Sequence, residues 1–212
     1  MGTIMQQRKA YIVDDDPDVC ESVAELLSSI GIQPVCFLSG QAFLAQIAEA
    51  TGDFISILDV QMPEMSGLEI QEQLREQAVI CPVIFLTGRG DVDTATSGMK
   101  HGALDFLQKP VDPGVLLDVV ESAFEKAAEL KAKKENQQRL EALFMRLTPR
   151  EREICFYLSQ GYTAKKIGRT LDISPRTAEI HRSRIMEKLS ASSSADLVAL
   201  SIAYGMRDQA QV

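Results

Sequence analysis

The chain has 212 residues, 45% of them hydrophobic and 25% charged, with a formal net charge of -8. This composition is typical of a folded globular protein and argues against a wholly disordered one. No apolar run approaches the roughly 20 residues that span a bilayer, and residues 1–10 lack the apolar core of a signal peptide. We therefore expect a cytoplasmic protein with no membrane association, whose four scattered cysteines are reduced thiols.

Charge divides the chain into an acidic part and a basic part. Residues 1–125 carry a net charge of -14, whereas residues 126–147 and 148–212 each carry +3. The length allows two modest domains, each with its own core. The asymmetry predicts that these domains have different partners and that only the C-terminal one approaches a polyanion.

The first 125 residues alternate between short apolar runs and segments of helical periodicity. Strands are expected at residues 10–13, 33–38, 54–58, 83–86 and 103–107. Helices are expected to end at Gly31, to span 39–49, 67–77 and about 91–102, and to begin again at 113. This order predicts an α/β domain with a five-stranded parallel sheet covered on both faces. The flavodoxin-like strand order 2-1-3-4-5 is the expected topology.

A charged segment and a set of short helices follow. Residues 126–146 are expected to form a mostly helical linker, because the polar run KAKKENQQR at 131–139 interrupts any apolar seam. Thr148, Pro149 and Glu151 have the spacing of a helix cap with a capping box. Further helices are predicted at 164–171, from the Ser174 cap to about 189, and at 195–203. Four short helices with a glycine turn indicate a small all-α helix-turn-helix domain.

Five polar side chains of the first domain follow predicted strands. Because the carboxyl ends of parallel strands share one edge, these side chains are expected to meet in one crevice. Clustered carboxylates attract a divalent cation such as Mg²⁺, which would neutralise a phosphoryl group, while an amine and a hydroxyl contact its oxygens. The five residues are Asp14, Asp15, Asp59, Thr87 and Lys109.

The motifs VDDD, LDVQMPEMSG, LTG and KP, in this order, resemble the receiver domain of bacterial response regulators. The resemblance covers residues 9–125 and implies that Asp59 is the phosphoacceptor. It also implies a Mg²⁺ site, switch residues, a phosphate-contacting lysine and a cis Lys109–Pro110 peptide. The Mg²⁺ ligands would be Asp14, Asp15, Asp59 and the backbone carbonyl of Gln61, and the switch residues would be Thr87 and Phe106, with Lys109 as the lysine.

The C-terminal segment 147–205, with the string SPRT…HR…IMEKL, resembles the LuxR-type helix-turn-helix domain. Together the two parts resemble a two-component response regulator of the NarL/FixJ type. The resemblance implies a receiver at 9–125, a linker at 126–146 and a DNA-binding domain at 147–205. It further implies that a sensor histidine kinase phosphorylates the receiver, that the protein then dimerises, and that it binds promoter DNA, with RNA polymerase as a further candidate partner.

The helix that starts after Ser174 is expected to enter the major groove. Residues 176, 179, 180, 183 and 187 lie on one face, and Thr177, Ala178, His181, Ile185 and Leu189 lie on the inward stripe. Ala178 and Glu179 replace the valine and lysine frequent in the family. Cations at 165, 166, 182, 184 and 188 are expected at phosphates. Thr177, although on the inward stripe, is also a candidate for DNA contact. The DNA-contact candidates are Lys165, Lys166, Arg176, Thr177, Glu179, Ile180, Arg182, Ser183, Arg184 and Lys188.

Two other functions are consistent with the same pocket. A phosphatase of the haloacid-dehalogenase type would need a second acid two residues after the nucleophile, where this chain has Gln61. We therefore expect no enzyme acting on external substrates, only self-directed phosphotransfer and autodephosphorylation at Asp59. A DNA-binding regulator that keeps the pocket only as structure remains the second alternative.

Overall fold

A computed structural model of the chain describes residues 8–47, 53–88 and 103–206. The chain forms two compact units, residues 1–132 and 133–212. None of the helices in the described ranges is long and apolar enough to cross a membrane.

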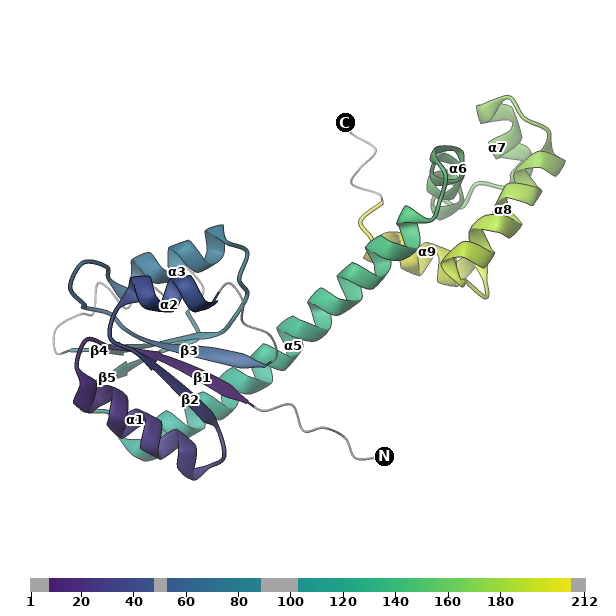
Figure 1. The fold of residues 1–212 in the computed structure, drawn as a ribbon. Coiled ribbons are helices and arrows are strands. Elements are labelled where there is room, and N and C mark those ends of the chain that lie inside the picture. The colour runs from purple at the N-terminus through teal and green to yellow at the C-terminus, as the bar shows by residue number, and fades with distance from the viewer. Residues whose placement is uncertain (1–7, 48–52, 89–102, 207–212) are drawn as a thin grey trace. The chain divides into compact units, whose positions relative to one another are not determined.

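The first unit contains a five-stranded parallel sheet with the order β2-β1-β3-β4-β5 (Figure 1). This order confirms the flavodoxin-like topology predicted from the alternation of strands and helices. Because all strands run parallel, their carboxyl ends form one edge of the sheet. The strands are β1 (Lys9–Val13), β2 (Gln33–Phe37), β3 (Phe54–Asp59), β4 (Val83–Thr87) and β5 (Asp105–Gln108).

The first unit's helices begin at the polar caps that the sequence offers. Asp16 caps α1 (Pro17–Ser29), and Ser66 with Glu69 forms a capping box on α3 (Gly67–Glu76). The Ser39 hydroxyl accepts from the Ala42 amide at the start of α2 (Gly40–Ile47), the helix predicted over 39–49. The helix predicted near 91–102 lies outside the described residues. The last helix that begins in the first unit is α5 (Pro113–Met145), whose residues from 133 onward belong to the second unit.

The sheet separates two apolar cores, with α1 and α5 covering one face and α2 and α3 the other (Figure 1). Neighbouring strand residues alternate between them: Ile12 packs into the first core and Val13 into the second. Both are fully buried. Burial on both faces fixes the register of the strands, and with it the position of each residue at the carboxyl edge.

The second unit contains the four predicted helices: α6 (Pro149–Ser159), α7 (Ala164–Leu171), α8 (Pro175–Leu189) and α9 (Ser194–Ala203). Both hydrogen bonds of the predicted Thr148–Glu151 capping box are present, and Ser174 caps α8. Gly168 permits a tight turn between α7 and α8, since a Cβ there would lie 2.7 Å from the carbonyl oxygen of Ile173.

The core of the second unit includes residues that precede α6. Phe144 and Leu147 are buried in this core, and the Phe144 ring stacks on Tyr204 with centroids 4.1 Å apart. Helix α5 continues through the polar run at 131–139 without a break. The domain limits at 125 and 147 stay predictions, but the apolar contacts of the second unit begin before residue 147.

Candidate functional site

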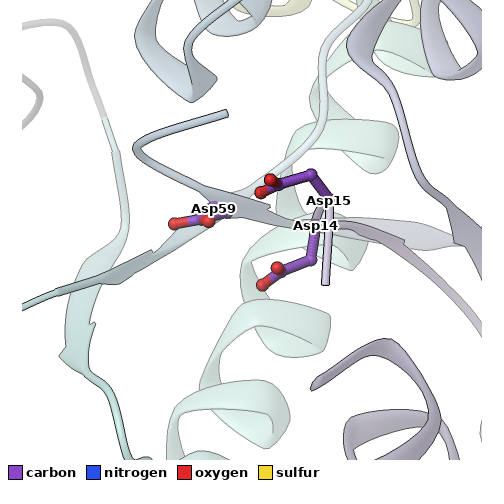
Figure 2. A group of neighbouring side chains, drawn as sticks. All are labelled: Asp14, Asp15 and Asp59. Carbon is purple, nitrogen blue, oxygen red and sulfur yellow. The ribbon is translucent and has the colours of Figure 1, made fainter. Parts of the chain in front are cut away.

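Three aspartates lie together at the carboxyl edge of the sheet (Figure 2). Asp14 and Asp15 follow β1, and Asp59 ends the neighbouring strand β3. One carboxylate oxygen from each lies within 4.8 Å of the others. Asp14 is fully buried and Asp59 is 7% exposed, whereas Asp15 is exposed. The sequence prediction that these three carboxylates meet agrees with this geometry.

The Lys109 ammonium lies between the two buried carboxylates. Its Nζ is 2.6 Å from Asp14 Oδ2 and 3.0 Å from Asp59 Oδ2. Burial alone would lower the pKa of Lys109, but hydrogen bonds and charge from both aspartates outweigh burial and raise it. Burial raises the pKa of Asp14, with Asp59 adding to this and Lys109 opposing it. The peptide that positions this lysine, Lys109–Pro110, is cis, as the resemblance implies.

Backbone groups orient the same carboxylates. Asp14 Oδ1 accepts from the amide of Asp16 at 3.1 Å, and Asp59 Oδ1 accepts from the amide of Gln61 at 3.3 Å. Gly67 lets α3 begin close to β3, because a Cβ at this position would collide with the carbonyl oxygen of Asp59. The residues after Asp59 therefore fold tightly over the strand end and fix the orientation of its side chain.

The remaining receiver candidates lie on or near this edge. Thr87 ends β4 and is 9% exposed, and its hydroxyl donates to the carbonyl of Gly88 at 3.3 Å. Gln61 is exposed, two residues after Asp59. Phe106 is half-buried on β5, where its ring stacks on Phe85 with a centroid separation of 4.8 Å. Movement of the Phe106 ring therefore requires a change in its contact with Phe85 of the second apolar core.

The charge of the pocket suits a divalent cation. Three carboxylates face one ammonium, which leaves an excess of two negative charges in a largely buried site. Carboxylate and carbonyl oxygens with room for water are the ligands that Mg²⁺ prefers. The residues present therefore fit a Mg²⁺ site.

In the second unit, one face of α8 is free of core contacts. Its residues at positions 176, 179, 180, 183 and 187 are exposed, and Ile180 is 47% exposed despite its apolar side chain. Ala178, Ile185 and Leu189 are buried on the opposite side, while Thr177 and His181 are half-buried. The division into an outward and an inward face is the one predicted.

The basic candidates differ in their local contacts. Lys165 and Arg184 are exposed, and Lys166 Nζ lies 3.4 Å from the centre of the Tyr162 ring. Arg182 donates to Ser194 Oγ at 2.9 Å and approaches Glu179 Oε2 at 3.5 Å.

Lys188 has a partner that sequence reasoning missed. Its Nζ lies 2.6 Å from Oε2 of Glu151, which is 3% exposed. The capping-box pattern identified Glu151 as a helix-start residue. No local signal pairs it with a lysine 37 positions later on another helix.

Comparison with known proteins identifies both domains. Residues 10–121 match the family model "Response regulator receiver domain", and residues 145–201 match "Bacterial regulatory proteins, luxR family". The chain is 39% identical over 193 residues to the response regulator protein TmoT of Ectopseudomonas mendocina, covering 91% of this chain and 87% of that protein. It is 36% identical over 196 residues to the transcriptional regulatory protein FixJ of Bradyrhizobium diazoefficiens, covering 92% and 95%.

A solved structure of the response regulator StyR is 37% identical, has a TM-score of 0.81 and covers 93% of this chain and 100% of that one. Such a receiver domain implies a histidine kinase as partner, and the LuxR-type domain implies DNA binding. The chain therefore belongs to the NarL/FixJ-type response regulators and is a two-component transcriptional regulator.

Proposed function

We propose that Asp59 is the residue that accepts the phosphoryl group. An Asp59 carboxylate oxygen attacks the phosphorus of a phosphohistidine on the kinase, an O–P bond forms, the P–N bond breaks, and the imidazole leaves. The observation that carries this proposal is the Lys109 ammonium, 3.0 Å from Asp59 Oδ2 and 2.6 Å from Asp14 Oδ2. After transfer, the Lys109 ammonium contacts a phosphoryl oxygen in place of the Asp59 carboxylate oxygen.

The other pocket residues have separate roles in this proposal. Asp14, Asp15, Asp59 and the carbonyl of Gln61 would hold Mg²⁺, which would supply positive charge to offset the phosphoryl oxygens. Thr87 turns its hydroxyl toward the phosphoryl group, and Phe106 moves with it. Autodephosphorylation at the same aspartate resets the receiver, so the chemistry is self-directed. The added charge shifts an element with two packing states, which is how phosphorylation acts elsewhere.

The outward face of α8 reads promoter DNA in the major groove. Arg176, Glu179, Ile180 and Ser183 face the bases, Thr177 borders them, and Lys165, Lys166 and Arg184 contact phosphates. Arg182 and Lys188 remain phosphate candidates, although each has a partner within the protein. Phosphorylation produces a homodimer whose two modules bind paired half-sites, which compensates for a charge of only +3 in residues 148–212. RNA polymerase would be contacted from the DNA-bound dimer.

DNA footprinting on genomic fragments, with and without acetyl phosphate and Mg²⁺, tests this function. We expect protection of paired sites at lower protein concentration after phosphorylation. A fragment of residues 133–212 should bind at least as well as the unphosphorylated chain if the receiver blocks the output unit. It begins at 133 because Phe144 and Leu147 belong to that unit's core. Weaker binding by the fragment would favour activation by dimer formation, and unchanged affinity after phosphorylation would favour the regulator with a vestigial receiver.

Substitutions on α7 and α8 should separate affinity from sequence preference. Lys165→Gln should weaken binding equally for all sequences and reduce the salt dependence by about one phosphate contact. Glu179→Ala should change the preference at one base pair of selected sites, because a carboxylate can accept from cytosine N4. Binding titrations at several salt concentrations, with Lys134→Gln in the linker as control, distinguish these outcomes. Equal effects of Lys165→Gln and Lys134→Gln would remove Lys165 from the interface.

A further inference from the structure

The first unit has a groove at the end of the sheet opposite Asp59. It lies between the end of α3, the start of β4 and α5, and its volume is about 590 Å³. Pockets for small organic ligands usually measure about 300–1,000 Å³. We call it the α3–α5 groove, and its main apolar lining residues are Leu74, Val79, Ile80, Pro82, Leu104 and Leu130.

The charged side chains of the α3–α5 groove are all of one sign. Among its described lining residues the only charged ones are Arg75 and Lys126, and none is acidic. This is unusual in the first unit, because residues 1–132 carry a net charge of -13. The groove is thus apolar with a basic rim, which complements an apolar molecule that carries a negative charge.

The two cations are not locked into strong contacts. Arg75 pairs with Glu72 at 2.7 Å and Lys126 with Glu129 at 2.9 Å, both one helical turn away on the same helix. All four side chains are at least half exposed. Exposed ion pairs of this kind contribute little to stability. A ligand carboxylate can therefore share or replace the glutamates at little cost.

A buried amide in the wall gives a second, independent indication. Gln71 lines the groove, is 8% exposed, and its Oε1 has no hydrogen-bond partner. Leaving a buried polar group unpaired costs stability, so such groups in native proteins call for an explanation. The unpaired atom is a carbonyl oxygen, so a ligand with an O–H or N–H group that donates to it explains its burial beside the groove.

We propose that the α3–α5 groove binds a hydrophobic monocarboxylate that also carries a hydroxyl group. Its apolar body packs on Leu74, Ile80 and Leu130, its carboxylate lies toward Arg75 and Lys126, and its hydroxyl donates to Gln71 Oε1. This site goes beyond the proposed phosphorylation function and does not depend on it. Its position on α5 places the ligand against the helix that leaves the first unit.

A matched pair of probes tests the proposal on the full chain. We choose 6-hydroxy-2-naphthoate and its neutral methyl ester, which share one apolar body and one hydroxyl group. The chain has no tryptophan, so naphthalene fluorescence can be followed without an indole background. We expect saturable binding, with the carboxylate bound roughly two- to fivefold more tightly than the ester at low salt, as exposed charge contacts allow. The preference should shrink as ionic strength rises.

Three variants test whether the probes bind in the α3–α5 groove. Lys126→Gln should remove most of the preference for the carboxylate, whereas Lys133→Gln, with the same charge change two turns along α5, should not. Ile80→Gln should weaken both probes, whereas Leu38→Gln, another apolar residue more than half exposed, should weaken neither. Gln71→Leu should weaken both probes, because it removes the acceptor of their hydroxyl group, and it should not lower the melting temperature, because the amide oxygen it removes is unpaired.

Several results would overturn the inference. Equal affinity of the hydroxynaphthoate and its ester for the wild type would exclude the basic rim as a carboxylate site. Equal losses in Ile80→Gln and Leu38→Gln would indicate nonspecific adsorption. A Gln71→Leu protein that is less stable but binds the hydroxynaphthoate unchanged would make the amide purely structural. Absence of saturable binding of either probe would exclude the site.

Discussion

Protein carrying Asp59→Asn is expected to take no radiolabel from acetyl phosphate under conditions in which the wild type is labelled. The amide keeps the size and shape of the carboxylate but has no anionic oxygen to attack phosphorus. Lys109 retains its ion pair with Asp14 at 2.6 Å, so the pocket should stay folded. The measurement is the radiolabel retained by acid-precipitated protein after incubation with Mg²⁺. A chelator should abolish labelling of the wild type as well.

Asp53→Asn is the matched control. Asp53 belongs to the same unit and pairs with Lys131 at 3.0 Å, but it precedes β3, at the opposite end of the strand that Asp59 ends. Its substitution removes one carboxylate and leaves the pocket untouched, so labelling should persist. Label on Asp59→Asn protein would show that another group accepts the phosphoryl, and loss of label from Asp53→Asn protein would show that the assay reports folding.

The fold of the first unit could be predicted from the sequence because the patterns that determine it are short-range. Apolar strands buried on both faces, the helix start at Ser39 and the helix-ending Gly31 are all visible within a few residues of sequence. The meeting of Asp14 with Asp59 follows from one further step, since the parallel order places both at one edge. The parallel strand order, combined with these short-range patterns, therefore predicts the aspartate pocket.

What the sequence could not supply are contacts between distant side chains. Nothing near Lys188 indicates that it pairs with Glu151, and nothing near Lys126 indicates that it borders a groove with Arg75. Such contacts depend on how helices pack, and a residue's periodicity gives only the face on which it lies. For that reason the pocket of the first unit was predicted as a set, whereas the cations of α8 could be predicted only as exposed or inward.

Lys188→Met is expected to destabilise the second unit by about 2–3 kcal/mol. Glu151 is 3% exposed, and without Lys188 its carboxylate keeps the hydrogen bond from the backbone amide of Thr148, the residue that caps α6. Removing one partner of a buried pair typically costs about 3–5 kcal/mol, and the 31% exposure of Lys188 lowers this figure. For a unit of this size the melting temperature should fall by roughly 10 °C or more.

Lys165→Met is the control, because Lys165 is an exposed cation of the same unit. It should change the melting temperature by little, since surface substitutions usually alter stability by less than about 0.5 kcal/mol. Thermal unfolding of the 133–212 fragment, followed by circular dichroism, measures both variants. Equal stability of Lys188→Met and the wild type would show that the pair is broken in solution, and would leave Lys188 free for a DNA phosphate.

The pH dependence of this difference identifies its cause. Burial alone would raise the pKa of Glu151, but Lys188 and the Thr148 contacts outweigh burial and lower it from 4.5 to about 2. Because the folded-state pKa of Glu151 is lowered, its ionised carboxylate contributes about 3 kcal/mol to the free energy of unfolding above pH 4.5, and this contribution is lost as the pH falls toward 2.

In the Lys188→Met variant burial acts without the opposing ammonium, so protonation of Glu151 relieves an unpaired charge. The wild type should therefore lose stability over this range while the variant loses less or gains, and the two unfolding curves should converge near pH 2. Parallel curves would assign the effect of the substitution to packing of the lysine stem rather than to the charge pair.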